Sequence, residues 1–148
     1  MPHEIPPRNK PSDDSGYLEE LTKSVFQAGF SWRVIRDKWP GFQRAFDGFD
    51  VATVAGYGEP DVERLTNDRE IVRNRRKIEA TIQNARVIWD VGREYGSFHA
   101  FLRSLDHLDY ADRRRELAHR FRNLGATGVF TFLWCVDEPV PAWEDRKK

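Results

Sequence analysis

Residues 121–134 read FRNLGATGVFTFLW, and the apolar spacing on both sides of 124–128 predicts a helix, a tight turn and a second helix. The turn carries two glycines, which allow the backbone unusual conformations and a close approach to another surface. Thr127 is expected to cap the second helix. Such a turn points free amide N–H groups and the positive end of a helix dipole outward, which suits a phosphate. A glycine-containing turn between two packed helices has the same pattern, so both interpretations stay open.

The rest of the chain also has helical spacing, and no stretch alternates with period two for long. We therefore expect an all-α protein, with a compact fold of many helices. Its single helical domain covers 17–148, after a flexible, Pro-rich arm over 1–16. The expected helices begin near Tyr17 and at Ser31 and cover 51–55, 59–65, 75–93, 98–105 and 110–121. Asp50 and Ser97 are expected caps, and Pro40-Gly41 is expected to end the second helix.

The charges balance overall, with 24 Lys and Arg against 24 Asp and Glu, so net charge favours no class of partner. The positions of the charges along the chain are more informative about a partner. The segments 69–77 and 113–122 each carry five Lys or Arg residues and one Glu. Two such clusters can form a one-sided footprint for a polyanion. Charged residues on solvated helix faces would give the same composition.

The single cysteine, Cys135, excludes a disulfide within the chain and favours a cytoplasmic protein. Its apolar neighbours predict a small buried side chain rather than a nucleophile. The first residues lack the apolar run of a signal peptide or membrane span. The four histidines are scattered and lack ligand spacing, so we expect no metal and no cofactor.

Four blocks of sequence resemble the DNA-3-methyladenine glycosylase I (Tag) family, of the helix-hairpin-helix DNA glycosylase superfamily. The resemblance runs from about Tyr17 to about Val136. The ending VPAWE resembles a short form within the family, so we expect the chain to be complete. The blocks are VFQAGFSW (25–32), KWPGFQRAFDGFD (38–50), DVERLTNDREIVRNRRKIEATIQNAR (61–86) and FRNLGATGVFTFLW (121–134).

The resemblance implies a monofunctional DNA glycosylase that acts as a monomer on double-stranded DNA in base excision repair. It would extrude and excise an alkylated purine, with 3-methyladenine the expected base. Gly29 and Phe30 would enter the gap left by the extruded nucleotide. Trp32 would stack on the cationic base, with Ser24 as a polar pocket group. The expected phosphate contacts are Arg73, Arg75, Lys77, Arg122, Leu124, Gly125, Ala126, Thr127 and Gly128. No lysine occupies the superfamily's Schiff-base position.

The chain departs from the family pattern in two ways. It lacks the two cysteines and two histidines that hold a structural zinc in the well-known members. Ser24 stands where those enzymes have a glutamate that hydrogen-bonds the base, and serine supplies no negative charge. Asp137 is the candidate catalytic carboxylate, with an exposed loop carboxylate as the alternative. Two other functions therefore stay open: a non-catalytic DNA-binding module, and a glycosylase for a different modified base.

Overall fold

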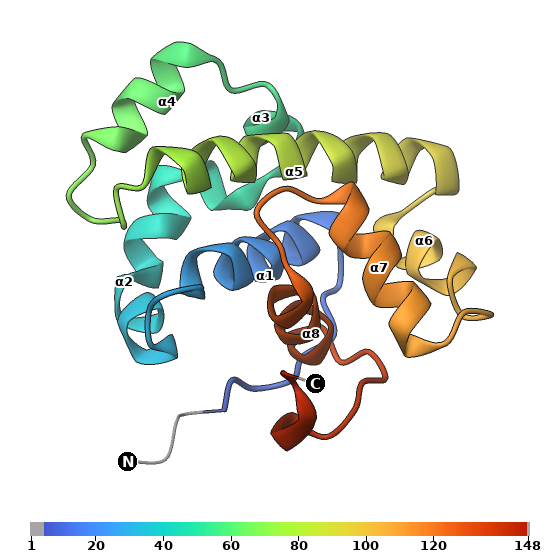
Figure 1. The fold of residues 1–148 in the computed structure, drawn as a ribbon. Helices are drawn as coiled ribbons and strands as arrows, with labels where there is room; N and C mark the ends of the chain where they lie inside the picture. Colours follow the sequence, from blue (N-terminus) through green and yellow to red (C-terminus); the bar gives the residue numbers. More distant parts are fainter. Residues whose placement is uncertain (1–4, 148) are drawn as a thin grey trace.

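The computed structural model describes residues 5–147, and within that range the regular structure is entirely helical (Figure 1). The expected all-α fold is confirmed. The helices are α1 (Asp14–Gln27), α2 (Trp32–Ala45), α3 (Val51–Ala55), α4 (Glu59–Thr66), α5 (Arg75–Tyr95), α6 (Phe98–Ser104), α7 (Tyr110–Arg120) and α8 (Ala126–Cys135), with short 3₁₀ turns at Asp47–Phe49 and Trp143–Asp145.

The long helix α5 runs across the molecule, with α2, α3 and α4 toward one end and α6 and α7 toward the other (Figure 1). Helix α1 lies beneath it and contacts α2, α3, α5, α6 and α8. Apolar side chains from all eight helices meet in one contiguous core. Its largest fully buried members are aromatic, and they include Phe26, Phe42, Phe98 and Phe132. This packing fixes α1 and α8, the helices next to the candidate site.

Several helices begin where the sequence predicts, because a local side chain caps them. Ser31, Asp50 and Ser97 each accept a hydrogen bond from the backbone N–H three residues later. Helix α1 begins earlier than expected, since Asp13 is its cap and accepts from Gly16. The cap at Ser31 fixes the position of Trp32, the first residue of α2.

The expectation that Pro40-Gly41 ends the second helix is wrong, because α2 continues to Ala45. Proline removes one helical hydrogen bond, a cost that packing on both sides offsets here. The ring of Trp39 lies 4.9 Å from that of Phe42 and 5.2 Å from that of Phe49, both parallel to it within 16°. These buried stacks hold the turn after the proline in place.

The N-terminal segment lies against the end of the chain, which differs from the arm expected over 1–16. Residues 14–16 belong to α1, and residues 1–4 lie outside the described range. Arg8 donates to the carbonyls of Trp134 and Glu138, and its guanidinium lies 4.5 Å from the centre of the Trp134 ring. Trp134 in turn donates to Pro6 O at 2.8 Å. The segment is therefore joined to α8 by side chains from both partners.

Trp143 continues this contact, with its ring 5.0 Å from Trp134 and 5.8 Å from Phe130. Aromatic packing thus joins the 143–145 turn to α8. Over residues 5–147 no three His, Cys, Asp or Glu side chains converge as metal ligands. Nor does the described chain contain a helix with the length and apolar character needed to cross a membrane.

Candidate nucleic-acid interface and base pocket

The connection between α1 and α2, residues 28–31, forms an exposed turn. Gly29 has φ +86°, and a Cβ placed there would meet nothing within 4 Å. The position therefore favours glycine for its conformation and not for lack of space. Phe30 is 40% exposed, and its N–H donates to Gln27 O at 2.8 Å. An apolar ring is thus presented at the tip of a defined turn, as expected for a group that enters DNA.

Lys77 lies beneath this turn and is not available to a phosphate, so its expected role as a phosphate ligand is wrong. Its side chain is buried, and Nζ donates to Ala28 O at 2.6 Å and to Phe26 O at 3.2 Å. The ammonium also lies 5.2 Å from the centre of the Phe30 ring. Burial lowers the pKa of Lys77. The cation therefore binds the carbonyls at the end of α1 and supports the exposed turn.

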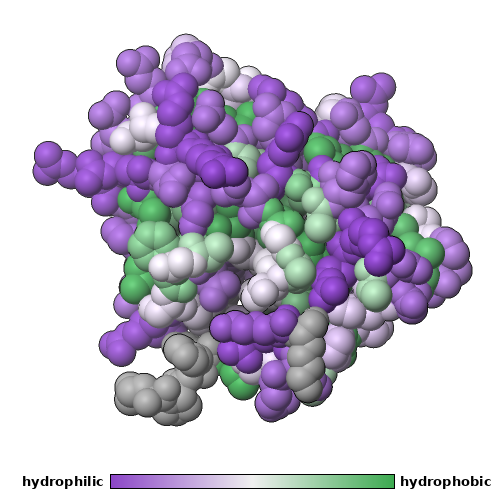
Figure 2. Space-filling view, in the orientation of Figure 1, coloured by the Kyte–Doolittle hydropathy of each residue, from purple (hydrophilic) through white to green (hydrophobic). Residues whose placement is uncertain are grey.

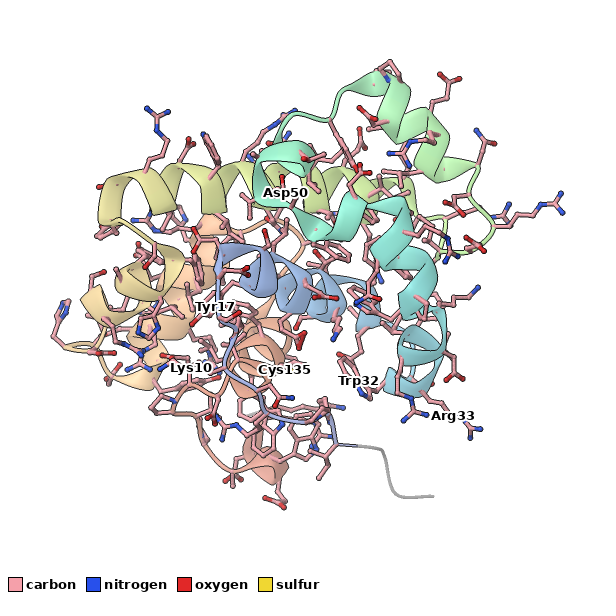
Figure 3. All side chains as sticks on the ribbon, turned by 180° about the vertical axis from the view of Figure 1, so that it is seen from behind. Lys10, Tyr17, Trp32, Arg33, Asp50 and Cys135 are labelled. Carbon is pink, nitrogen blue, oxygen red and sulfur yellow. The ribbon has the colours of Figure 1, made fainter. Side chains whose placement is uncertain are left out.

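Trp32 and Ser24 are both buried, at 8% and 2% exposure. Figure 3 shows Trp32 on the side of α2 that faces Lys10 and Cys135, whereas Arg33 points away from the molecule. Ser24 Oγ donates to the backbone oxygen of Glu20 at 3.3 Å. Its proton is therefore used within α1, and the hydroxyl offers only lone pairs to a ligand.

One helical turn before Ser24, the carboxyl of Glu20 lies half-buried on the same face of α1. It accepts a hydrogen bond from Lys23 at 2.8 Å. Burial is the largest cause that raises its pKa. Burial of the Cys135 thiol raises its pKa to about 12, and the negative charge of Glu20 is the next largest cause of this rise. Glu20 therefore lies close enough to α8 to act on Cys135. Sequence reasoning missed Glu20, although its spacing from Ser24 is the signal that could have found it.

The segment between α7 and α8 is held by Asn84, a buried residue of α5. Its Oδ1 accepts from Arg122 N at 2.7 Å, and its Nδ2 donates to Arg122 O at 3.2 Å. Both backbone groups of Arg122 are thus fixed by one amide side chain, and Asn123 adopts φ +57° directly after it. No local pattern predicts this role, because the two residues lie 38 positions apart.

Helix α8 begins at Ala126 with Gly125 as its cap residue, so the expected capping by Thr127 is wrong. Thr127 already lies inside the first turn, where its carbonyl accepts from Thr131 Oγ1. Glycine has no side chain to satisfy the first amides, and residues 125–127 are exposed. The first N–H groups of α8 therefore point to solvent without a side-chain partner. Leu124 is buried and can contribute only its backbone.

The candidate cations differ in availability. Arg122 and Arg73 are exposed. Arg75 is exposed but pairs with Glu59 at 2.6 Å and with Glu79 at 3.7 Å, and the bond to Glu59 raises its pKa. Three residues of the basic segment at 73–77 were predicted to bind phosphates. Among them, Arg73 is the one whose charge is exposed and not paired with a glutamate in these contacts.

Figure 2 shows where these segments lie on the surface. Pale and green residues gather over the connection between α1 and α2, and again over the segment that precedes α8. Both areas lie on the same face, and the surface is hollowed between them. The exposed turn at 28–31 and the free amides at 125–127 are therefore presented together to one side of the molecule.

Asp137 lies away from this face. Its carboxylate is 3.4 Å from Arg8 Nε, at the end of α8 opposite to Gly125. Helix α8 has ten residues, so about 15 Å separates its two ends. The neighbouring Glu138 is buried and paired with Arg103. The structure thus places both carboxylates in contacts with arginines and does not bring them to the hairpin.

Residues 8–131 match the profile of the methyladenine glycosylase family. The chain belongs to this family. The methyladenine glycosylase match covers α1 to α7 and the larger part of α8, so it includes both exposed segments of the candidate interface.

Two methyladenine glycosylases are each similar to about half of the chain. It is 47% identical over 75 residues to DNA-3-methyladenine glycosylase 1 of Escherichia coli K12, which is 51% of this chain and 40% of that protein. It is 32% identical over 78 residues to the Haemophilus influenzae DNA-3-methyladenine glycosylase, which is 52% of this chain and 42% of the other. The aligned segments thus span about two fifths of these relatives.

Solved structures of methyladenine glycosylases share the fold over most of the chain. A variant of 3-methyladenine DNA glycosylase I in complex with 3-methyladenine superposes with a TM-score of 0.77 at 28% identity, over 86% of this chain and 79% of that one. The Staphylococcus aureus enzyme gives 0.76 at 28% identity, over 86% and 78%. A solution structure of 3-methyladenine DNA glycosylase I gives 0.71 at 27% identity, over 89% and 79%.

Proposed function

We propose that this protein is a monofunctional DNA glycosylase that extrudes and excises 3-methyladenine from double-stranded DNA in base excision repair. One observation carries the proposal: the Gly29-Phe30 turn and the uncapped start of α8 lie on one face, with the surface hollowed between them. Membership of the methyladenine glycosylase family and the solved complex of a structural relative with 3-methyladenine support it.

In the proposed complex, the amides of 125–127 and the side chains of Arg122 and Arg73 bind backbone phosphates. Phe30 enters the stack at the extruded nucleotide and fills the gap, which offsets part of the few kcal/mol that unstacking costs. Trp32 receives the base. The positive charge of 3-methyladenine strengthens its stacking on the indole face.

Bond cleavage in this proposal relies on the substrate more than on an acid or base of the protein. The N-glycosidic bond breaks with its electron pair going to the base, and the methylated cationic adenine leaves as a neutral molecule. Water then adds to the oxocarbenium-like sugar and loses a proton. We assign no step to Asp137, because its carboxylate is paired with Arg8 at the far end of α8. Glu20 is the half-buried carboxyl one helical turn from Ser24 and could bind the polar edge of the base.

The test is incubation of the protein with N-methylated duplex DNA, followed by chromatography of the released bases. Release of 3-methyladenine that Trp32→Ala abolishes is expected, with Trp89→Phe, at an exposed tryptophan of α5, as the control. Tight binding to abasic-site DNA without release of any base would favour the DNA-binding module. Release of a different base would change the substrate and leave the reaction class intact.

The phosphate contacts have a separate test. Arg122→Ala should lower the slope of log affinity against log salt concentration by about one unit, because one phosphate contact is lost. Arg115→Ala is the matched control, since Arg115 pairs with Asp112 on the same helix-turn-helix unit. An unchanged slope in Arg122→Ala would remove this arginine from the interface.

A further inference from the structure

Trp89 lies in the middle of α5 with 44% of its surface exposed, whereas Trp32 and Trp39 are buried. Two surface hollows flank its ring, with volumes of about 310 and 410 Å³. Trp89 and Ala52 line both hollows, so the two are continuous around the indole. The methyl side chain of Ala52 is too short to cover the ring. A large apolar ring in a surface depression is typical of a docking site.

The rim of these hollows is acidic. It carries four carboxylates, Asp13, Asp14, Asp50 and Asp90, and two cations, Arg86 and Arg93. The guanidinium of Arg86 is directed to Ala55 O at 2.8 Å and Tyr57 O at 2.9 Å, at the end of α3. The formal balance is thus two negative charges in excess, which opposes the approach of a phosphate backbone.

The carboxylates at the rim have oxygen atoms that can still accept hydrogen bonds from a ligand. Asp13 uses Oδ1 to cap α1, and Asp50 uses Oδ2 to cap α3, which leaves the other oxygen of each toward solvent. Asp90 is exposed and directly follows Trp89. A cation on the indole face would therefore find carboxylate oxygens beside it, and both interactions favour the same kind of side chain.

This surface lies away from the proposed DNA face. Helix α3, which Asp50 begins, stands behind α5 in Figure 1 and in front of it in Figure 3. The segment before α8 belongs to the face seen in Figure 2. A partner seated on Trp89 could therefore bind while the opposite face is occupied.

We propose that the Trp89 surface is a docking site for a protein partner, which inserts an exposed lysine or arginine side chain over the indole. The acidic rim selects a basic segment and disfavours nucleic acid. This inference is independent of the DNA glycosylase activity, since none of the residues that line the hollows belongs to the proposed interface.

The experiment titrates the whole protein with a hexalysine peptide and follows the indole N–H resonance of Trp89, assigned from its loss in Trp89→Phe. The resonance should move at low salt. Trp89→Ala should weaken binding about tenfold, and Asp90→Lys should weaken it as well. Tyr95→Ala, which removes another exposed aromatic of α5, is the matched control and should bind as the parent protein does.

Three results would overturn the docking proposal. Hexalysine could bind Trp89→Ala as tightly as the parent, duplex DNA could move the Trp89 resonance, or sedimentation could reveal a dimer that Trp89→Ala abolishes. Base release by Trp89→Ala is measured in parallel and should equal that of the parent. Failure of that activity in both proteins would refute the glycosylase and leave the docking site untouched.

Discussion

Replacement of Lys77 by methionine tests whether a buried cation holds the exposed turn at 28–31. Methionine keeps the length and apolar stem of the side chain but removes two charge-assisted hydrogen bonds, to Ala28 O and Phe26 O. Such bonds contribute about 1.5–3 kcal/mol each, and release of a buried ammonium offsets part of the loss. A net loss of about 2 kcal/mol for the ordered turn corresponds to a roughly thirtyfold smaller ratio of ordered to disordered turn.

The assay pairs single-turnover base release from methylated duplex DNA with urea unfolding. Lys77→Met should lower base release by up to about thirtyfold at subsaturating protein, with an unchanged salt dependence of binding, because no phosphate contact is lost. Lys77→Arg should recover part of the activity. The matched control is Arg76→Met, which removes the same charge from an exposed neighbour. Equal effects of the two methionine variants, or a reduced salt slope in Lys77→Met, would refute the reasoning and return Lys77 to the phosphate ligands.

Three further predictions concern the pocket and the two exposed turns. The pKa of Glu20 lies above its usual 4.5, so the folded state keeps a proton that the unfolded state loses, and stability falls as the pH rises above that usual value. Glu20→Gln should therefore gain stability relative to the parent as the pH rises above 4.5, measured by urea unfolding. Burial raises the pKa of Cys135 to about 12, so iodoacetamide at pH 8 should label it only after denaturation, and rapid labelling of the native protein would contradict this. Gly29→Ala should cost about 1 kcal/mol in thermal unfolding because of its φ of +86°, whereas Gly125→Ala, at φ −81°, should leave stability unchanged and weaken DNA binding by blocking the first amides of α8.

The predictions from sequence succeeded where one short-range interaction decides the structure. Asp50 and Ser97 cap their helices as expected, because a cap depends on a side chain and an amide three residues apart. The prediction that Pro40 ends the second helix was wrong because Trp39 stacks on rings that come later in the chain. This stacking outweighs the helical hydrogen bond that proline removes. The prediction that Thr127 caps α8 was wrong because Gly125 adopts the extended conformation of a cap residue. Helix α8 therefore begins at Ala126, two residues earlier than a cap at Thr127 would require.

In the candidate site, too, the features set by neighbouring residues could be predicted and those set by distant contacts could not. The exposure of Phe30 and the left-handed backbone of Gly29 agree with the sequence pattern, since both are properties of a short turn. The direction of Lys77 could not be predicted from a run of cations, because it depends on carbonyls 49 and 51 positions away. Its place in the buried stripe of α5, one helical turn before Thr81, was the available signal.

The contact between Arg8 and Trp134 joins residues 126 positions apart, which sets an order of events during synthesis. A chain emerging from the ribosome can form α1 to α5 and much of their shared core while the segment around Arg8 still lacks its binding surface. Closure of so long a loop is entropically costly and comes late. Until it occurs, the indole of Trp134 and the apolar side of α8 remain uncovered. A nascent or Arg8→Ala chain should therefore be more prone to aggregation and to capture by chaperones than the finished fold.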